Sequence, residues 1–118
     1  MAIKPHNAWH SVGVVTLRSQ YHVERSADRY RIRSVTPRDA EFGQAVEGKV
    51  VRYLAKALEG QTVTVEQAIS ALLKSGLRLP YQYGHKLRYF TQDALVALVA
   101  SGQASHTRVG RRFEYIIA

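Results

Sequence analysis

The stretch that decides the fold is LVALVASGQASHTRVGRRFEYII, residues 95–117. It begins with the apolar end of a helix and reaches Gly102, where we expect that helix to end. Two runs that alternate like strands follow, over residues 103–109 and 112–117, with Gly110 and Arg111 between them. This spacing predicts a β-hairpin with a tight turn. One face of its second strand carries Phe113, Tyr115 and Ile117.

The residues before this stretch favour a single helix from about Gln82 to Ser101, bent near Thr91. In that helix the buried face would carry Leu87, Phe90, Ala94 and Leu98. The alternative is a helix that begins at Thr91, because threonine is a common N-cap and Phe90 with Leu95 would form a hydrophobic staple. The choice decides whether the basic residues before Thr91 belong to the helix.

A second helix is expected just upstream. Thr64 and Gln67 have the spacing of a capping box, and Gly76 marks the end of the helix. Residues 61–64, QTVT, predict a short extended segment before it. The apolar positions of this helix keep helical spacing throughout: Val65, Ala68, Ile69, Leu72 and Leu73.

A longer first helix is expected from Thr36 to Gly60, because threonine followed by Pro37 is a common helix start and glycine a common stop. Gly43 and Gly48 disfavour its first turns, since each interior glycine costs about 1 kcal/mol relative to alanine. We therefore expect those turns to be irregular or to pass close to another backbone.

The first 35 residues predict strands at 12–17, 21–24 and 30–35, after a mobile tail at residues 1–8. In the third strand one face is largely apolar and the other is basic. The first carries Tyr30, Ile32 and Ser34, and the second carries Arg31, Arg33 and Val35.

The composition favours one globular domain that binds a polyanion. The 118 residues include 17 Lys and Arg against 9 Asp and Glu, which gives a net charge of +8. Such an excess attracts nucleic acid, an anionic membrane surface or an acidic protein. The longest apolar run, residues 94–100, is too short to cross a bilayer, and the start of the chain lacks a signal-peptide pattern. We expect a cytoplasmic protein with no membrane partner.

Nothing in the sequence is typical of an enzyme. The chain has no cysteine, and it has no close pair of carboxylates, nucleophile motif or glycine-rich phosphate loop. We expect neither catalysis nor a metal ion or other cofactor.

From residue 36 onward the expected order is helix, short strand, helix, turn, helix and hairpin. In this order, and above all in residues 95–117, the chain resembles the winged helix-turn-helix superfamily. The resemblance implies that residues 36–118 form three helices and a C-terminal β-hairpin wing. With the strands predicted for residues 1–35 as an N-terminal β-strand extension, the expected fold class is α+β. The resemblance also implies a sequence-specific DNA-binding protein, a small transcriptional regulator, that forms a homodimer through the N-terminal strands or the first helix.

The same resemblance places the helix before the wing in the major groove of double-stranded DNA and the wing tip on phosphates. The DNA-facing residues would then be His85, Lys86, Arg88, Tyr89 and Gln92 on the helix, with Arg108, Arg111 and Arg112 on the wing. Arginine suits guanine edges and glutamine suits adenine edges. A further group is either a second phosphate-binding patch or the solvent face of a strand: Arg29, Arg31, Arg33 and Arg38.

A protein-interaction module on the same scaffold is the alternative function, either an adaptor or a phage- or plasmid-type inhibitor of host machinery. Its N-terminal strands would provide the adhesive edge for the protein partner. The aromatic and basic residues that alternate in YQYGHKLRYF, residues 81–90, also suit stacking on single-stranded bases. Convergence of the basic residues on one face would favour DNA, and scatter would favour the interaction module.

Overall fold

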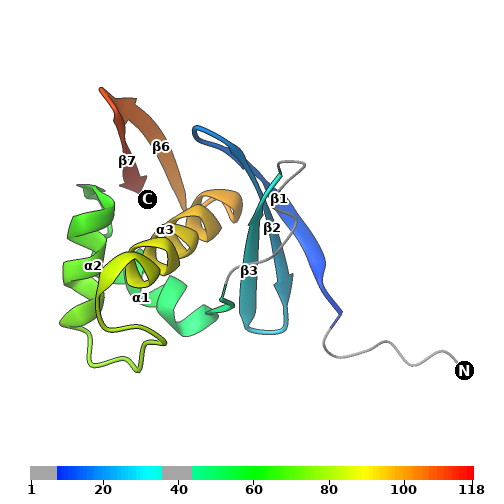
Figure 1. Cartoon of the computed structure of the whole chain (residues 1–118), viewed down its shortest axis with the longest axis horizontal. Coiled ribbons are helices and arrows are strands. Elements are labelled where there is room, and N and C mark those ends of the chain that lie inside the picture. Colours follow the sequence, from blue (N-terminus) through cyan, green and yellow to red (C-terminus); the bar gives the residue numbers. More distant parts are fainter. Residues whose placement is uncertain (1–7, 36–43) are drawn as a thin grey trace, which may run out of the picture.

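The computed structural model describes residues 8–35 and 44–118, in which two antiparallel sheets flank a group of three helices (Figure 1). In chain order the elements are β1 (His10–Thr16), β2 (Gln20–Ser26), β3 (Arg29–Ser34), β4 (Val46–Glu47), α1 (Gly48–Ala57), β5 (Thr62–Val63), α2 (Val65–Leu73), α3 (Gly84–Ala100), β6 (Ala104–Val109) and β7 (Arg112–Ile117). None of the helices described is long and apolar enough to span a membrane.

The N-terminal strands are not a separate appendage, because they share one hydrophobic core with the helices. Their sheet has the order β1-β2-β3-β4, and the alternation expected for β3 is confirmed. Tyr30 and Ile32 are buried, whereas Arg31 and Arg33 lie on the opposite face. The expected mobile tail spans residues 1–8, and residues 1–7 of it lie outside the described part of the chain.

The first helix is shorter than predicted. It begins at Gly48, and Val46 pairs with Tyr30 of β3 as part of β4, so the helix does not run continuously from Thr36. The proposed start itself lies in residues 36–43, outside the described part of the chain. Gly48 donates its backbone N–H to the Asp28 carbonyl at 2.6 Å, so the expected close approach to another backbone is confirmed. Pairing with β3 therefore overrides the helical pattern here.

The second helix follows its local signals closely. Thr64 and Gln67 form the reciprocal capping box, and Gly76 adopts a positive φ of 76° shortly after the helix ends. Val65, Ala68 and Leu72 are buried, but Leu73 is 51% exposed, so its assignment to the core face is wrong. The buried face is thus narrower than the apolar pattern.

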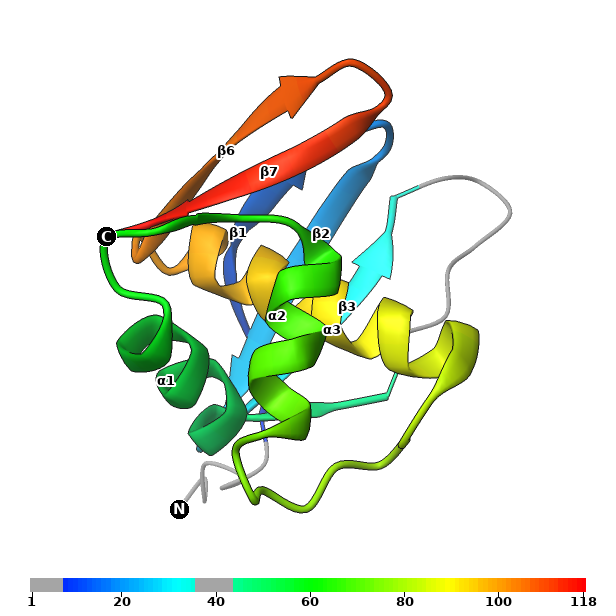
Figure 2. The same cartoon turned by 90° about the vertical axis from the view of Figure 1, so that its left-hand side faces the viewer.

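The third helix, α3, is continuous through Thr91, so the alternative start at that residue is wrong. The Thr91 hydroxyl is buried and donates to the Leu87 carbonyl at 2.8 Å, one turn back along the helix. The N-terminal sheet lies on one side of α3, with α1 and α2 on the other (Figure 2). The four apolar residues predicted for its buried face, Leu87, Phe90, Ala94 and Leu98, are all buried.

The C-terminal hairpin is confirmed, with β6 and β7 joined by Gly110 and Arg111. Gly110 has a φ of 63°, which suits the first position of a two-residue hairpin turn. Tyr115 and Ile117 are buried, while β5 pairs with the other edge of β7 to give the sheet order β5-β7-β6. The hairpin is therefore anchored to the core at its base and extends into solvent at its turn.

Candidate nucleic-acid interface

The turn of the β6–β7 hairpin and the turn between β1 and β2 lie close together, above the start of α2 and the middle of α3 (Figure 1). Between these elements is a half-enclosed groove of about 370 Å³. We call it the arginine groove, because four arginines from three parts of the chain line it: Arg18, Arg88, Arg111 and Arg112. Glu66 is the one acidic residue of its lining, so the lining carries a net charge of +3.

Arg18 closes one end of this groove. Its guanidinium donates a hydrogen bond to the backbone carbonyl of Arg111, so the two hairpin turns touch. Sequence analysis did not single out Arg18, because it lies in an ordinary turn 93 positions before its partner. The sequence near Arg18 offers one hint of this role: Arg18 is a basic residue at a hairpin turn, as Arg111 is in the C-terminal hairpin.

The other three arginines of the groove differ in their carboxylate partners. Arg88 pairs with Glu66, and the Arg88 guanidinium holds the pKa of that carboxyl below its usual value. Arg112 reaches Glu114 at 3.3 Å. Arg111 has no ion pair with any described residue. Exposed ion pairs of this kind contribute at most about 1 kcal/mol, so an incoming phosphate can compete for these guanidinium groups.

Arg108, the remaining arginine predicted for the hairpin, lies along the hairpin and does not line the groove. Its Nε donates to the Gly110 carbonyl at 3.0 Å, and its guanidinium carbon lies 6.0 Å from the centre of the Phe113 ring. This arrangement keeps an exposed positive charge beside the turn.

The residues predicted on α3 divide into two groups. Arg88 and Gln92 line the arginine groove, whereas His85, Lys86 and Tyr89 are exposed outside its lining. The second half of α3 is covered by the N-terminal sheet and the other helices, so its residues from Ala94 to Leu98 are buried. Only the first half of α3 can therefore meet a partner.

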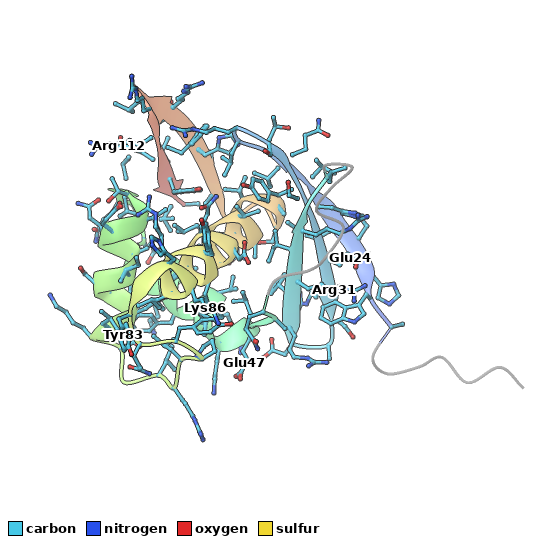
Figure 3. The ribbon with its side chains drawn as sticks, viewed as in Figure 1. Glu24, Arg31, Glu47, Tyr83, Lys86 and Arg112 are labelled. Carbon is cyan, nitrogen blue, oxygen red and sulfur yellow. The ribbon has the colours of Figure 1, made fainter. Side chains whose placement is uncertain are left out.

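The second basic group lies elsewhere. Arg31 and Arg33 are on the face of the N-terminal sheet that points away from α3, and Figure 3 shows Arg31 beside Glu24 on the side of the molecule opposite Arg112. Arg31 binds Glu24 at 2.6 Å and stacks 4.4 Å from the Trp9 ring, which also has Arg29 at 5.6 Å. Arg38 lies outside the described residues. The basic residues therefore do not all converge on one face. Those of α3 and the β6–β7 hairpin meet at the arginine groove, as expected for DNA binding, whereas those of the N-terminal strands form a separate surface, as expected for the interaction module.

Asp93 is a titratable group of α3 that sequence analysis did not select. It is half-buried, and burial raises the pKa of its carboxyl to about 7. Tyr115 lines the arginine groove, and burial raises the pKa of its hydroxyl to about 12. Tyr21 raises that pKa further, Arg88 lowers it, and the negative charge of Asp93 makes the smallest contribution, upward. A carboxyl that changes charge near neutral pH therefore lies within electrostatic reach of the groove.

The described residues contain no group of three or more histidine and acidic side chains placed to hold a metal ion. Comparison with protein-family models, curated proteins and solved structures gave no match to this chain.

Proposed function

We propose that this protein binds double-stranded DNA through the arginine groove and the first half of α3, and that it acts as a small transcriptional regulator. The observation that carries the proposal is the convergence of Arg18, Arg88, Arg111 and Arg112 on one groove that contains a single carboxylate. Guanidinium groups bind phosphate oxygens through forked hydrogen bonds, and a cluster of them favours a polyanion.

The arrangement of elements supports this proposal. The order α1, β5, α2, α3, β6 and β7, with the sheet order β5-β7-β6, agrees with the winged helix-turn-helix resemblance from the sequence. In that superfamily the N-terminal part of the recognition helix reads base edges, which matches the part of α3 that remains exposed. The β6–β7 hairpin would be the wing, with Arg111 and Arg112 on phosphates.

Each exposed side chain would then have a distinct role. Arg88 and Gln92 lie one turn apart on α3 and would read bases, since arginine pairs with guanine and glutamine with adenine. His85, Lys86 and Tyr89 would contact the backbone beside them, and Arg108 would add a charge near the wing.

A second candidate function is binding to a protein partner. It is favoured by the outer face of the N-terminal sheet, where Trp9 stacks with Arg29 and Arg31 on the side opposite Arg112. A DNA duplex whose phosphates meet the arginine groove would leave this face free. An acidic partner or a second copy of the chain would be accommodated there.

Selection of bound duplexes from a random pool tests the DNA proposal, because the enriched duplexes themselves identify the target sequence. We expect one sequence to be enriched, and Arg88→Ala to lose about 1 to 3 kcal/mol of binding to that sequence but little on random DNA. Arg78→Ala is the matched control, since Arg78 is exposed and does not line the groove. Failure to enrich any sequence, or equal losses on both DNAs, would contradict sequence-specific reading by α3.

A further inference from the structure

The start of α3 exposes aromatic rings to an unusual degree. Tyr83 is 85% exposed and Tyr89 is 63% exposed, more than the other large hydrophobic side chains that are exposed among the described residues. Tyr83 makes no ring contact or side-chain hydrogen bond within the described part of the chain. A large exposed ring has a free energy cost in water, and the apolar hollow of residues 81–86 beside Tyr83 makes this a candidate binding surface.

A third ring at the start of α3, that of Tyr81, is anchored to the core. Tyr81 packs edge-on against the buried Phe90, with ring centres 6.4 Å apart, and the Lys86 ammonium lies 5.8 Å from the Tyr81 ring. Residues 81–86 also line a shallow, mostly apolar hollow of about 500 Å³. The surface therefore offers an apolar floor beside a fixed positive charge, and Figure 3 shows Tyr83 and Lys86 on this part of the molecule.

The charge of the chain segment that carries these rings favours one class of partner. Residues 67–92 contain Lys74, Arg78, Lys86 and Arg88 but neither aspartate nor glutamate. On α3, His85 and Tyr89 are one turn apart, and Arg88 and Gln92 form the adjoining row that leads into the arginine groove. Rings interleaved with cations suit unpaired bases, because each base stacks on a ring while its phosphate meets a neighbouring cation.

We propose that the exposed Tyr83 ring, beside the apolar hollow of residues 81–86, stacks an unpaired base, so that the preferred ligand is DNA in which a duplex adjoins a single-stranded segment. The proposal rests on the proposed function, and it extends that function by naming the form of the DNA. The phosphates of the duplex would contact the arginine groove, and the unpaired strand would continue across the start of α3.

The test compares one labelled blunt duplex with the same duplex carrying a single-stranded extension of about six nucleotides. Fluorescence anisotropy gives both dissociation constants. We expect the extension to tighten binding, because each stacked base contributes between about 5-fold and about 150-fold. Tyr83→Leu should abolish this gain and leave binding to the blunt duplex unchanged. Tyr83→Phe should retain the gain, because phenylalanine keeps the ring and loses only the hydroxyl.

Three binding results would overturn the inference. They are no gain in affinity from the extension, a gain that persists in Tyr83→Leu, and a Tyr83→Leu variant that binds the blunt and the extended duplex equally more weakly. Association of two copies through this surface would also overturn it, and would appear as a concentration-dependent sedimentation coefficient that Tyr83→Leu removes. Binding of the blunt duplex without any gain would leave the proposed duplex function intact. Binding of the free single strand with no binding of either duplex would contradict both the proposed duplex function and the inferred form of the ligand.

Discussion

Asp93 gives the protein a pH-dependent stability that a single substitution can isolate. Its carboxyl has an ordinary pKa of 3.8, and burial raises the pKa in the folded protein to about 7. Between these two values the folded state binds a proton that the unfolded state has lost, so stability falls as the pH rises from about 4 to about 7. The contribution of one such proton reaches about 1.4 kcal/mol per pH unit.

We therefore expect Asp93→Asn to be more stable than the original protein at pH 8 and nearly equal to it at pH 4. Urea denaturation at several pH values measures the free energy of unfolding of both proteins. The other ionisable groups affect both proteins equally, so the difference between the two reports on Asp93. Parallel pH profiles for the two proteins would show that the Asp93 carboxyl is not desolvated by the fold.

Arg18 is the residue that extends the proposed DNA site to the N-terminal sheet. If its guanidinium contacts a phosphate, Arg18→Gln should reduce the slope of log affinity against log salt by about 0.9. Arg78→Gln removes the same charge from an exposed position outside the arginine groove, and it should leave the slope unchanged. Equal slopes for the two variants would exclude the β1–β2 turn from the interface.

At the level of elements, α2 tests how the helices pack. Leu72 is 1% exposed and Leu73 is 51% exposed, although both fit the same apolar pattern. Leu72→Ala should destabilise the protein by about 2 to 5 kcal/mol, because it leaves a cavity in the core. Leu73→Ala should change stability by about 0.5 kcal/mol or less, as surface substitutions usually do. Comparable losses in denaturant titration would mean that α2 packs on a different face.

The elements that the sequence predicts well are those with local signals. The capping box of α2 and the Gly110 turn of the β6–β7 hairpin each involve residues a few positions apart, and both form as expected. The start of α1 depends instead on the pairing of Val46 with Tyr30, which the helical pattern around it does not reveal. Long-range pairing thus limits what periodicity alone can predict.

For the whole molecule, the candidate site could be predicted only in part. Arg88, Gln92, Arg111 and Arg112 were selected from the sequence, and the fold brings them to one groove. Arg18 completes that groove through a contact between distant turns, and no local pattern reports such a contact. The separation of Arg31 from Arg112 likewise follows from the packing of the N-terminal sheet on α3.

The two basic surfaces lie on different sides of the molecule, so two partners could bind to it at once. The arginine groove faces one side, and the Trp9 surface with Arg29 and Arg31 lies on the outer face of the N-terminal sheet. A duplex in the groove and a protein on that sheet would therefore bind without competing. Under the proposed function, this arrangement would let the protein hold DNA and a partner at the same time.

The salt dependence of binding to duplex DNA tests the central claim most directly. Arg111 and Arg112 are exposed at the turn of the β6–β7 hairpin, and each phosphate contact should contribute about −0.9 to the slope of log affinity against log salt. Replacing both by alanine should flatten the slope by about 1.8 and weaken binding to all duplex sequences about equally, since phosphates carry no sequence information. An unchanged slope for the double variant would show that the hairpin lies outside the interface and would contradict DNA binding through the arginine groove.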